Sequence, residues 1–186
     1  MLSLDQGNTL LKLARGAIAE HLGYTPIERL QADWLQQLGA TFVTLTKNKE
    51  LRGCIGTLEA RLPLIEDVRN NAVAAAFHDS RFDPLTESEY AEISIEVSLL
   101  STPEPLNFTY EDEALSQLVP DRDGVILEMG HHRATFLPQV WAQLPIPSKF
   151  LAHLKNKAGL PSDYWSDELN LSRYTVQKWN EGEQHG

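Results

Sequence analysis

Residues 93–99 read ISIEVSL, a run in which isoleucine, valine and leucine alternate with serine and glutamate. Successive residues of a β-strand point to opposite faces of a sheet, so this run predicts a strand with one apolar and one polar face. The apolar face is expected to cover a core. The opposite face then carries Ser94, Glu96 and Ser98, and a second strand beside it would add its own side chains there.

Two earlier runs predict a hairpin. Residues 41–46 are rich in β-branched side chains, and the polar residues 47–50 connect them to a strand-like run at 51–58. A further hairpin is predicted from residues 125–127 and 133–137. Helices are predicted over 3–22, from Pro63 onward, over 110–118 and over 147–158. Because the strands come in hairpins more than in βαβ units, the predicted fold class is α+β, with a mixed or mostly antiparallel sheet packed with helices.

Composition restricts the class of protein. The chain has 186 residues, a formal net charge of −10 and one cysteine. The length fits one domain, with residues 181–186 as a tail. The excess negative charge argues against a nucleic acid or an anionic membrane as the partner. A single cysteine excludes an internal disulfide and a cluster held by four cysteines of this chain, and no apolar run is long enough to span a membrane, so we expect a cytoplasmic protein without a bound cofactor.

The run LRGCIG at residues 51–56 brings the one cysteine, Cys54, into the predicted sheet. In a regular strand Leu51 and Ile55 point one way, and we expect them to share a core with the apolar face of 93–99. A guanidinium, a thiol, a carboxylate and a hydroxyl then gather on the other face, from Arg52, Cys54, Glu96 and Ser98. Glycine inside a strand often marks a close approach by another backbone or by a ligand, which applies to Gly53 and Gly56.

The gathered groups allow two interpretations. In the first, Cys54 is a nucleophile or thiol carrier activated by Arg52, and Glu96 is its acid or base. In the second, Cys54 is a small buried core residue, and Glu96 is a strand charge or the ionic partner of Arg52. The residues alone leave both open, because no histidine is fixed near Cys54 by the sequence.

Two charged residues follow the helix that opens at Pro63. Asp79 and Arg81 either bind an anionic substrate, together with Arg52 and Ser98, or form a salt bridge that locks the helix exit. No spacing of histidine, cysteine and carboxylate residues indicates a metal site, and the adjacent histidines at 131–132 are more simply part of a turn. The predicted ligand of the sheet face is therefore polar and anionic, and no metal is expected.

The LRGCIG run resembles the hallmark hexapeptide of the AMMECR domain family. Six further blocks resemble that family in the same order, at 79–82 with 84–85, 95–98, 123–127, 136–141, 150–151 and 157–161. The resemblance covers residues 5–179. One departure is Ser80, where the family often has proline after the aspartate.

The resemblance implies a single AMMECR-type domain over 1–186, with a larger and a smaller lobe. Similar prokaryotic proteins are encoded beside a Memo-like protein and a radical S-adenosylmethionine enzyme, in what is called the AmmeMemoRadiSam system, which makes these two proteins the expected partners. One hypothesis is then a thiol-dependent enzyme or enzyme accessory in small-molecule or protein modification, with its site around Cys54. The second hypothesis is a protein-binding adaptor without chemistry of its own.

Overall fold

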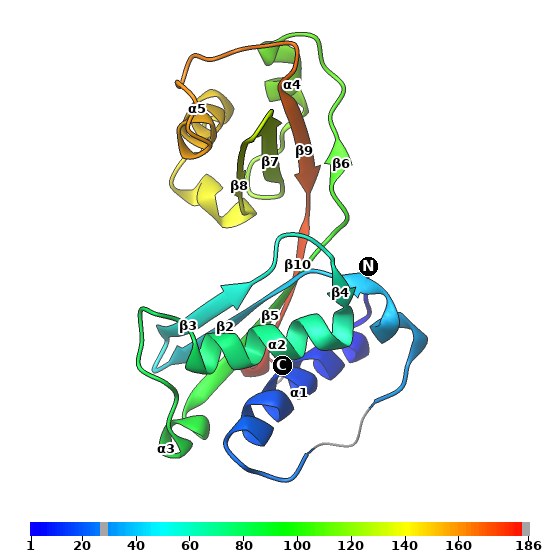
Figure 1. Ribbon diagram of the computed structural model, residues 1–186, viewed down its shortest axis with the longest axis vertical. Helices are drawn as coiled ribbons and strands as arrows, with labels where there is room; N and C mark the ends of the chain where they lie inside the picture. Colours follow the sequence, from blue (N-terminus) through cyan, green and yellow to red (C-terminus); the bar gives the residue numbers. More distant parts are fainter. Residues whose placement is uncertain (27–29, 184–186) are drawn as a thin grey trace. The chain divides into compact units, whose positions relative to one another are not determined.

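The computed structural model describes residues 1–26 and 30–183, which belong to two compact units (Figure 1). Unit 1 consists of Met1–Leu100 with Gln177–Gly186, and unit 2 of Ser101–Val176. Each unit has its own sheet and its own hydrophobic core. The predicted α+β class, with a larger and a smaller lobe, is confirmed. Among the described residues no helix is long and apolar enough to cross a membrane.

Unit 1 is built on a four-stranded sheet in the order β10-β5-β2-β3, which leaves β3 at one edge. Strand β2 pairs antiparallel with both β3 and β5. The strands are β2 (Thr41–Lys47), β3 (Glu50–Gly56), β5 (Ile93–Leu100) and β10 (Val176–Asn180). A separate two-stranded sheet joins β1 (Leu38–Gly39) and β4 (Leu62–Pro63). The predicted first hairpin is therefore present, and 93–99 is a central strand.

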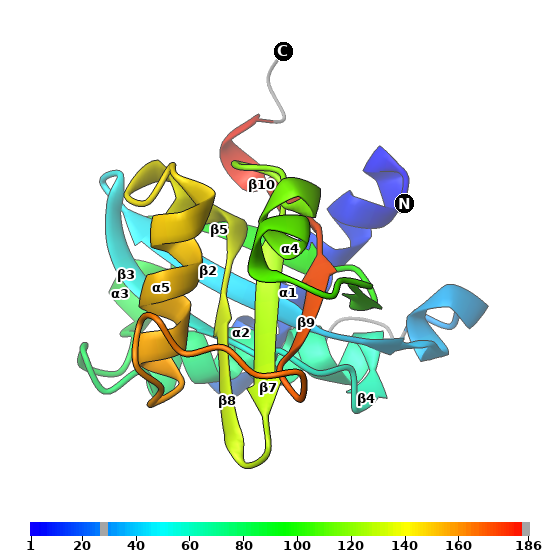
Figure 2. The same ribbon diagram turned by 90° about the horizontal axis from the view of Figure 1, so that it is seen from above.

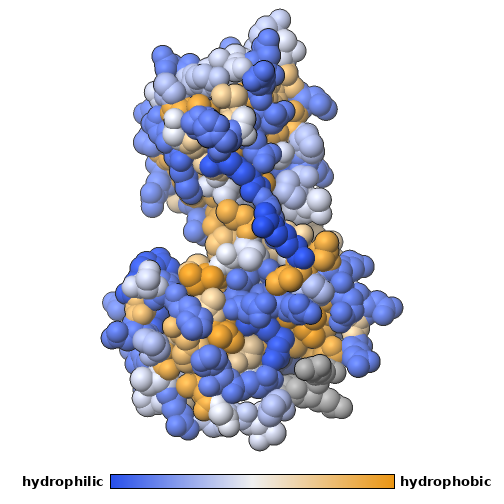
Figure 3. Space-filling view, in the orientation of Figure 1, coloured by the Kyte–Doolittle hydropathy of each residue, from blue (hydrophilic) through white to orange (hydrophobic). Residues whose placement is uncertain are grey.

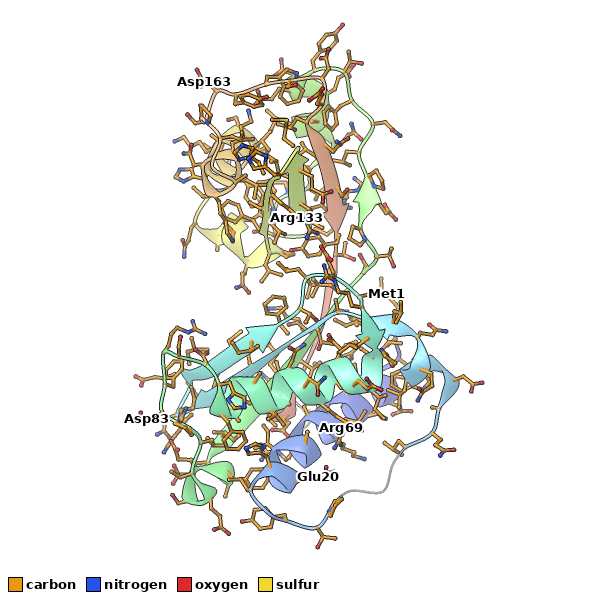
Figure 4. All side chains as sticks on the ribbon, in the orientation of Figure 1. Met1, Glu20, Arg69, Asp83, Arg133 and Asp163 are labelled. Carbon is orange, nitrogen blue, oxygen red and sulfur yellow. The ribbon has the colours of Figure 1, made fainter. Side chains whose placement is uncertain are left out.

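Unit 1 contains a short helix α3 (Glu87–Tyr90) and 3-10 turns at Asp33–Gln36 and Glu181–Glu183. Its two longer helices, α1 (Leu4–His21) and α2 (Leu64–Phe77), cover one face of this sheet, as Figure 1 shows. Aliphatic residues of β2 and β5, such as Val43 and Ile95, are fully buried against them. Glu20 of α1 and Arg69 of α2 point toward each other in Figure 4, and their side chains form an ion pair at 2.6 Å. The opposite, polar face of the sheet is thus left without a helix of unit 1.

Unit 2 contains a second antiparallel sheet in the order β6-β9-β7-β8, with helices α4 and α5 on it (Figure 2). Its elements are β6 (Glu104–Pro105), α4 (Glu111–Gln117), β7 (Gly124–Met129), β8 (His132–Phe136), a 3-10 turn (Pro138–Ala142), α5 (Pro147–Lys157) and β9 (Asn170–Tyr174). Trp141 is fully buried, stacks on Phe150 with ring centroids 3.7 Å apart, and donates its indole N–H to the carbonyl of Asp123 at 2.6 Å. This stack anchors α5 in the core of unit 2.

Hydrophilic residues dominate the visible surface in Figure 3, as a net charge of −10 leads one to expect. Glu181, at the start of the predicted tail, accepts hydrogen bonds from the guanidinium of Arg15 at 2.6 and 2.7 Å and from the backbone N–H of Ile95 at 2.9 Å. Its carboxylate thus ties the end of the chain to α1 and β5. Residues 181–183 of the predicted tail form a 3-10 turn, and its last residues, 184–186, lie outside the described residues.

Candidate functional site

The polar face of the unit 1 sheet carries a row of four side chains across all four strands. Thr44 of β2 is the direct neighbour of Cys54 on one side and of Glu96 on the other. The Thr44 hydroxyl lies 3.3 Å from the Cys54 sulfur, and Lys178 of β10 places its Nζ 3.5 Å from Glu96 Oε1. Directly paired residues of antiparallel strands share a face, so thiol, hydroxyl, carboxylate and ammonium lie in sequence across the sheet.

The row keeps Cys54 and Glu96 apart. Two strand spacings of about 4.8 Å separate their backbones, with Thr44 between them. The described ionic partner of Glu96 is Lys178. Cys54 and Glu96 therefore share the expected face, but the group next to the sulfur is the hydroxyl of Thr44, a residue with no role in the predicted site.

Ser98 lies one step further along β5 on the same face. It is 7% exposed and pairs with Phe42, which also pairs with Gly56. A Cβ added to Gly56 would lie 2.2 Å from the Phe42 ring, so the missing side chain makes room for that ring. Phe42 thus stands between the hydroxyl of Ser98 and the hexapeptide.

A β-bulge changes the orientation predicted for the start of the hexapeptide. Gly53 pairs with Leu45, but Leu51 pairs with Thr46, so the intervening Arg52 has no partner on β2. The extra residue moves Leu51 to the polar face, where its side chain is 44% exposed. The expectation that Leu51 shares the core with Ile55 is therefore wrong, because the regular alternation of a strand does not continue through a bulge.

Arg52 contacts α3 and the loop before it. Its Nε and Nη2 donate to the two carboxylate oxygens of Glu89 at 3.0 and 3.1 Å, and Nη2 also donates to the carbonyl of Asp83 at 3.0 Å. Hydrogen bonds from Arg52 and from Thr86 lower the pKa of Glu89 to about 2. Arg52 Nη1 is buried and has no hydrogen-bond partner among the described residues. The bidentate partner of Arg52 is thus Glu89, and Glu96 pairs elsewhere.

Asp79 and Arg81 close the free edge of β3 at Cys54. Asp79, only 5% exposed, accepts the backbone N–H of Cys54 through Oδ2 at 2.9 Å. Arg81 donates Nε to Asp79 Oδ1 at 2.9 Å and Nη2 to Asp79 Oδ2 at 2.7 Å, and Nη2 also reaches the carbonyl of Cys54 at 3.2 Å. The pair therefore takes the place of a further strand and fixes the backbone of Cys54. This geometry matches the salt-bridge interpretation of the two residues.

The same contacts predict a dependence of stability on pH. Hydrogen bonds from the Arg81 side chain and from the backbone N–H groups of Cys54 and Arg81 hold the pKa of Asp79 well below its usual range. A carboxyl group with a lowered folded-state pKa stabilises the fold above its unfolded pKa of about 3.9, and this contribution is lost as the pH falls. Asp79→Asn should thus lower the free energy of unfolding by about 1–2 kcal/mol at pH 7. The difference from the unchanged protein should narrow between about pH 5 and pH 2.

Urea unfolding at a series of pH values measures this difference. Asp83→Asn is the matched control, because Asp83 lies in the same loop and is exposed. Figure 4 labels it at the edge of the drawing. If the difference in unfolding free energy between Asp79→Asn and the unchanged protein stays constant down to pH 2, the lowered pKa of Asp79 is contradicted.

A buried polar cluster beside the hexapeptide was missed in the sequence analysis. Asp67 of α2 is 2% exposed and accepts four hydrogen bonds within 3.1 Å, from the backbone N–H and hydroxyl of Thr41, the hydroxyl of Thr57 and the amide of Asn71. Thr57 follows directly on Gly56. The available signal was the i, i+4 spacing of Asp67 and Asn71 on the side of α2 that also carries buried Leu64.

The chemistry available at the site follows from these groups. Cys54 is half-buried, its backbone is fixed at both polar atoms, and its sulfur contacts a hydroxyl. In the part of the chain that the structure describes, no three His, Cys, Asp or Glu side chains are placed to hold a metal ion. The row offers a thiol, a hydroxyl and a paired carboxylate and ammonium, which are groups that can bind a polar molecule.

Fold and site together define an α+β protein of two units that carries its one thiol on an edge strand closed by an aspartate–arginine pair. The chain belongs to the AMMECR1 family, whose family model matches residues 11–179. This confirms the resemblance drawn from the hexapeptide and the ordered blocks after it.

Relatives and a solved structure agree with this assignment. Protein MJ0810 of Methanocaldococcus jannaschii is 37% identical over 191 residues, covering 100% of this chain and 95% of the relative. A protein of Methanothermobacter thermautotrophicus is 40% identical over 185 residues, covering 97% of this chain and 96% of the relative. The crystal structure of the uncharacterized protein PH0010 from Pyrococcus horikoshii matches with a TM-score of 0.81 at 32% identity, covering 97% of this chain and 93% of that one.

Proposed function

We propose that this chain acts with a Memo-like protein and a radical S-adenosylmethionine enzyme in small-molecule or protein modification, and that its polar sheet face receives the substrate. The observation that carries the proposed substrate site is the Cys54 thiol, half-buried beside the Thr44 hydroxyl on the sheet face opposite α1 and α2. A reactive thiol must be held in one orientation while its sulfur stays reachable. The Asp79–Arg81 pair supplies the first of these conditions.

Each group has a role in this proposal. Cys54 is the nucleophile or thiol carrier. Glu96 and Lys178, beyond Thr44, contact the polar body of the substrate, because their separation from the sulfur suits binding better than proton transfer at it. Asp79 and Arg81 are positioning residues for Cys54, and Arg81, whose side chain is 55% exposed, is also placed to meet an anionic group.

Reconstitution with the two partner proteins tests the proposal, with mass spectrometry of small molecules and of the proteins as the readout. Cys54→Ser should abolish the product while leaving the fold intact, and Glu96→Gln should weaken substrate binding. Glu92→Gln is the matched control, because Glu92 is exposed and pairs with Lys47 away from the row. Alkylation before mixing should have the same effect as Cys54→Ser, since the chain has one cysteine.

An unchanged yield with Cys54→Ser would refute the role of the thiol. If that variant also co-purifies with either partner as well as the unchanged protein does, the adaptor function becomes the better account. Loss of the product together with intact partner binding supports the thiol-dependent function.

A further inference from the structure

Unit 2 contains a pocket of about 580 Å³ that the proposed function does not use. It lies between residues 106–109, which precede α4, and residues 165–170, which end at the first residue of β9. A hydrogen bond from the backbone N–H of Leu106 to the carbonyl of Leu171 joins the first of these segments to β9 at 2.8 Å. The volume of the pocket falls within the range of pockets that bind small organic molecules. All of its lining residues belong to unit 2, so it is formed by this unit alone.

The lining of this pocket, here called the unit 2 pocket, combines polar residues with four apolar or aromatic ones. Leu106 and Leu169 are 9% and 2% exposed and contribute to the core of unit 2. Phe108 and Trp165 are half-buried, with ring centroids 5.6 Å apart and ring planes inclined by 53°. Two tilted rings over an apolar base form a site for a group that favours aromatic faces.

The charges that line the pocket are all negative. Glu113 and Asp167 are both exposed at its edge, and neither lysine nor arginine is among the lining residues. Glu113 Oε2 accepts the backbone N–H of Thr109 at 2.7 Å, which fixes this carboxylate in place. Fixed negative charge beside aromatic faces favours an organic cation and disfavours an anion.

A neighbouring contact gives an independent observation in the same place. Lys155 is fully buried, and its Nζ lies 5.6 Å from the centre of the Trp165 ring and 3.0 Å from Glu111 Oε1. The Trp165 ring therefore already stabilises one ammonium group, whose charge Glu111 balances. The carboxylates of Glu113 and Asp167 are left to balance the charge of a ligand.

We propose that the unit 2 pocket binds an organic cation, an ammonium or guanidinium group carried on an apolar body. The cation lies against the rings of Phe108 and Trp165 and near the carboxylates of Glu113 and Asp167, and the apolar body covers Leu106 and Leu169. The proposal does not depend on Cys54. The cation comes either from a free amine or from a basic side chain of a protein.

Isothermal titration calorimetry of the full chain tests the proposal with matched ligands. Choline and agmatine represent free amines, and a short capped peptide with one lysine represents a protein side chain. The uncharged carbon isostere of choline, 3,3-dimethylbutan-1-ol, and succinate are the controls. We expect saturable binding of at least one cation and much weaker binding of both controls; which cation binds identifies the source.

Three variants locate the binding. Glu113→Gln keeps an oxygen that can accept the Thr109 N–H but removes the charge, Asp167→Asn removes the second charge, and Phe108→Leu removes a π-face. Each should weaken cation binding by about three- to tenfold. Asp112→Asn, in the same turn of α4 but outside the pocket lining, should leave it unchanged. No saturable binding of any cation at millimolar concentration, equal binding of the isostere, or equal effects of Asp112→Asn and Glu113→Gln would overturn the proposal.

Discussion

Gly53→Ala is expected to lower the free energy of unfolding by about 3 kcal/mol or more, because it forces a side chain into the backbone of α2. Gly53 pairs with Leu45 and so faces the core side of the sheet, where α2 lies. A Cβ at this position would be 2.1 Å from the carbonyl oxygen of Ala75 and 3.1 Å from its carbonyl carbon. These are backbone atoms of a helix, so no side-chain rotation relieves the contact.

Urea unfolding of the purified variant measures the effect of Gly53→Ala. Gly182→Ala is the matched control, since a Cβ there would find its nearest neighbour, the Asn180 side-chain oxygen, at 3.4 Å. The control should stay within about 1 kcal/mol of the unchanged protein. Equal stability of the two variants would show that α2 does not lie directly on the hexapeptide. The prediction thus tests the packing that holds Cys54 on the opposite face.

The sheet of unit 1 could be predicted because only one of its two faces is buried in the hydrophobic core. Ile95 and Val97 alternate with Glu96 along β5, and this alternation carries enough information to assign both faces of a strand. The alanines of α2 are small enough to let the helix pack closely on the sheet, and Ala72 and Ala75 are 0% and 1% exposed. Local patterns therefore identified the strands and helices from which the site is built.

The register of the hexapeptide could not be predicted in the same way. The turn between β2 and β3 consists of Asn48 and Lys49, both with positive φ (53° and 68°), where the sequence has no glycine. A turn of two left-handed residues is usually indicated by Asn-Gly or Asp-Gly, so without them the sequence predicts a longer connection of four polar residues. The bulge at Arg52 then displaced Leu51, and no local pattern indicates a bulge whose extra residue is arginine.

The interaction partners of the charged residues could not be predicted from local sequence patterns either. Arg52 pairs with Glu89 and Cys54 is held by Asp79, and these contacts span 37 and 25 residues of sequence. Residue type singles out Arg52, Cys54, Asp79 and Arg81 but not Glu89, and the observed salt bridge of Asp79 and Arg81 is one of the two interpretations that the sequence allows. Which carboxylate pairs with which guanidinium depends on the path of the loop after α2, and no local pattern indicates that path.

Asp67→Ala is expected to cost about 4 kcal/mol of unfolding free energy, because it removes the acceptor of four buried hydrogen bonds at once. The backbone N–H and hydroxyl of Thr41, the hydroxyl of Thr57 and one N–H of Asn71 would lose this acceptor. Among the described residues no cation pairs with Asp67, so the donors around it are hydroxyl, amide and backbone groups. The cluster joins the start of β2, the end of the hexapeptide and α2 through a single side chain.

Glu66→Ala is the matched control for Asp67→Ala. Both carboxylates lie in the first turn of α2, where a negative charge interacts favourably with the helix dipole. Glu66 is exposed, whereas Asp67 is buried. Urea unfolding should therefore give a loss within about 1 kcal/mol for Glu66→Ala, so that the excess for Asp67→Ala measures the buried cluster. The loss of unfolding free energy for Asp67→Asn should lie between the losses for these two variants. The amide oxygen of the asparagine can still accept a hydrogen bond, while its NH₂ group faces other donors. Similar losses for Glu66→Ala and Asp67→Ala would mean that water reaches these donors, and that Thr57 and the hexapeptide before it are held by the sheet alone.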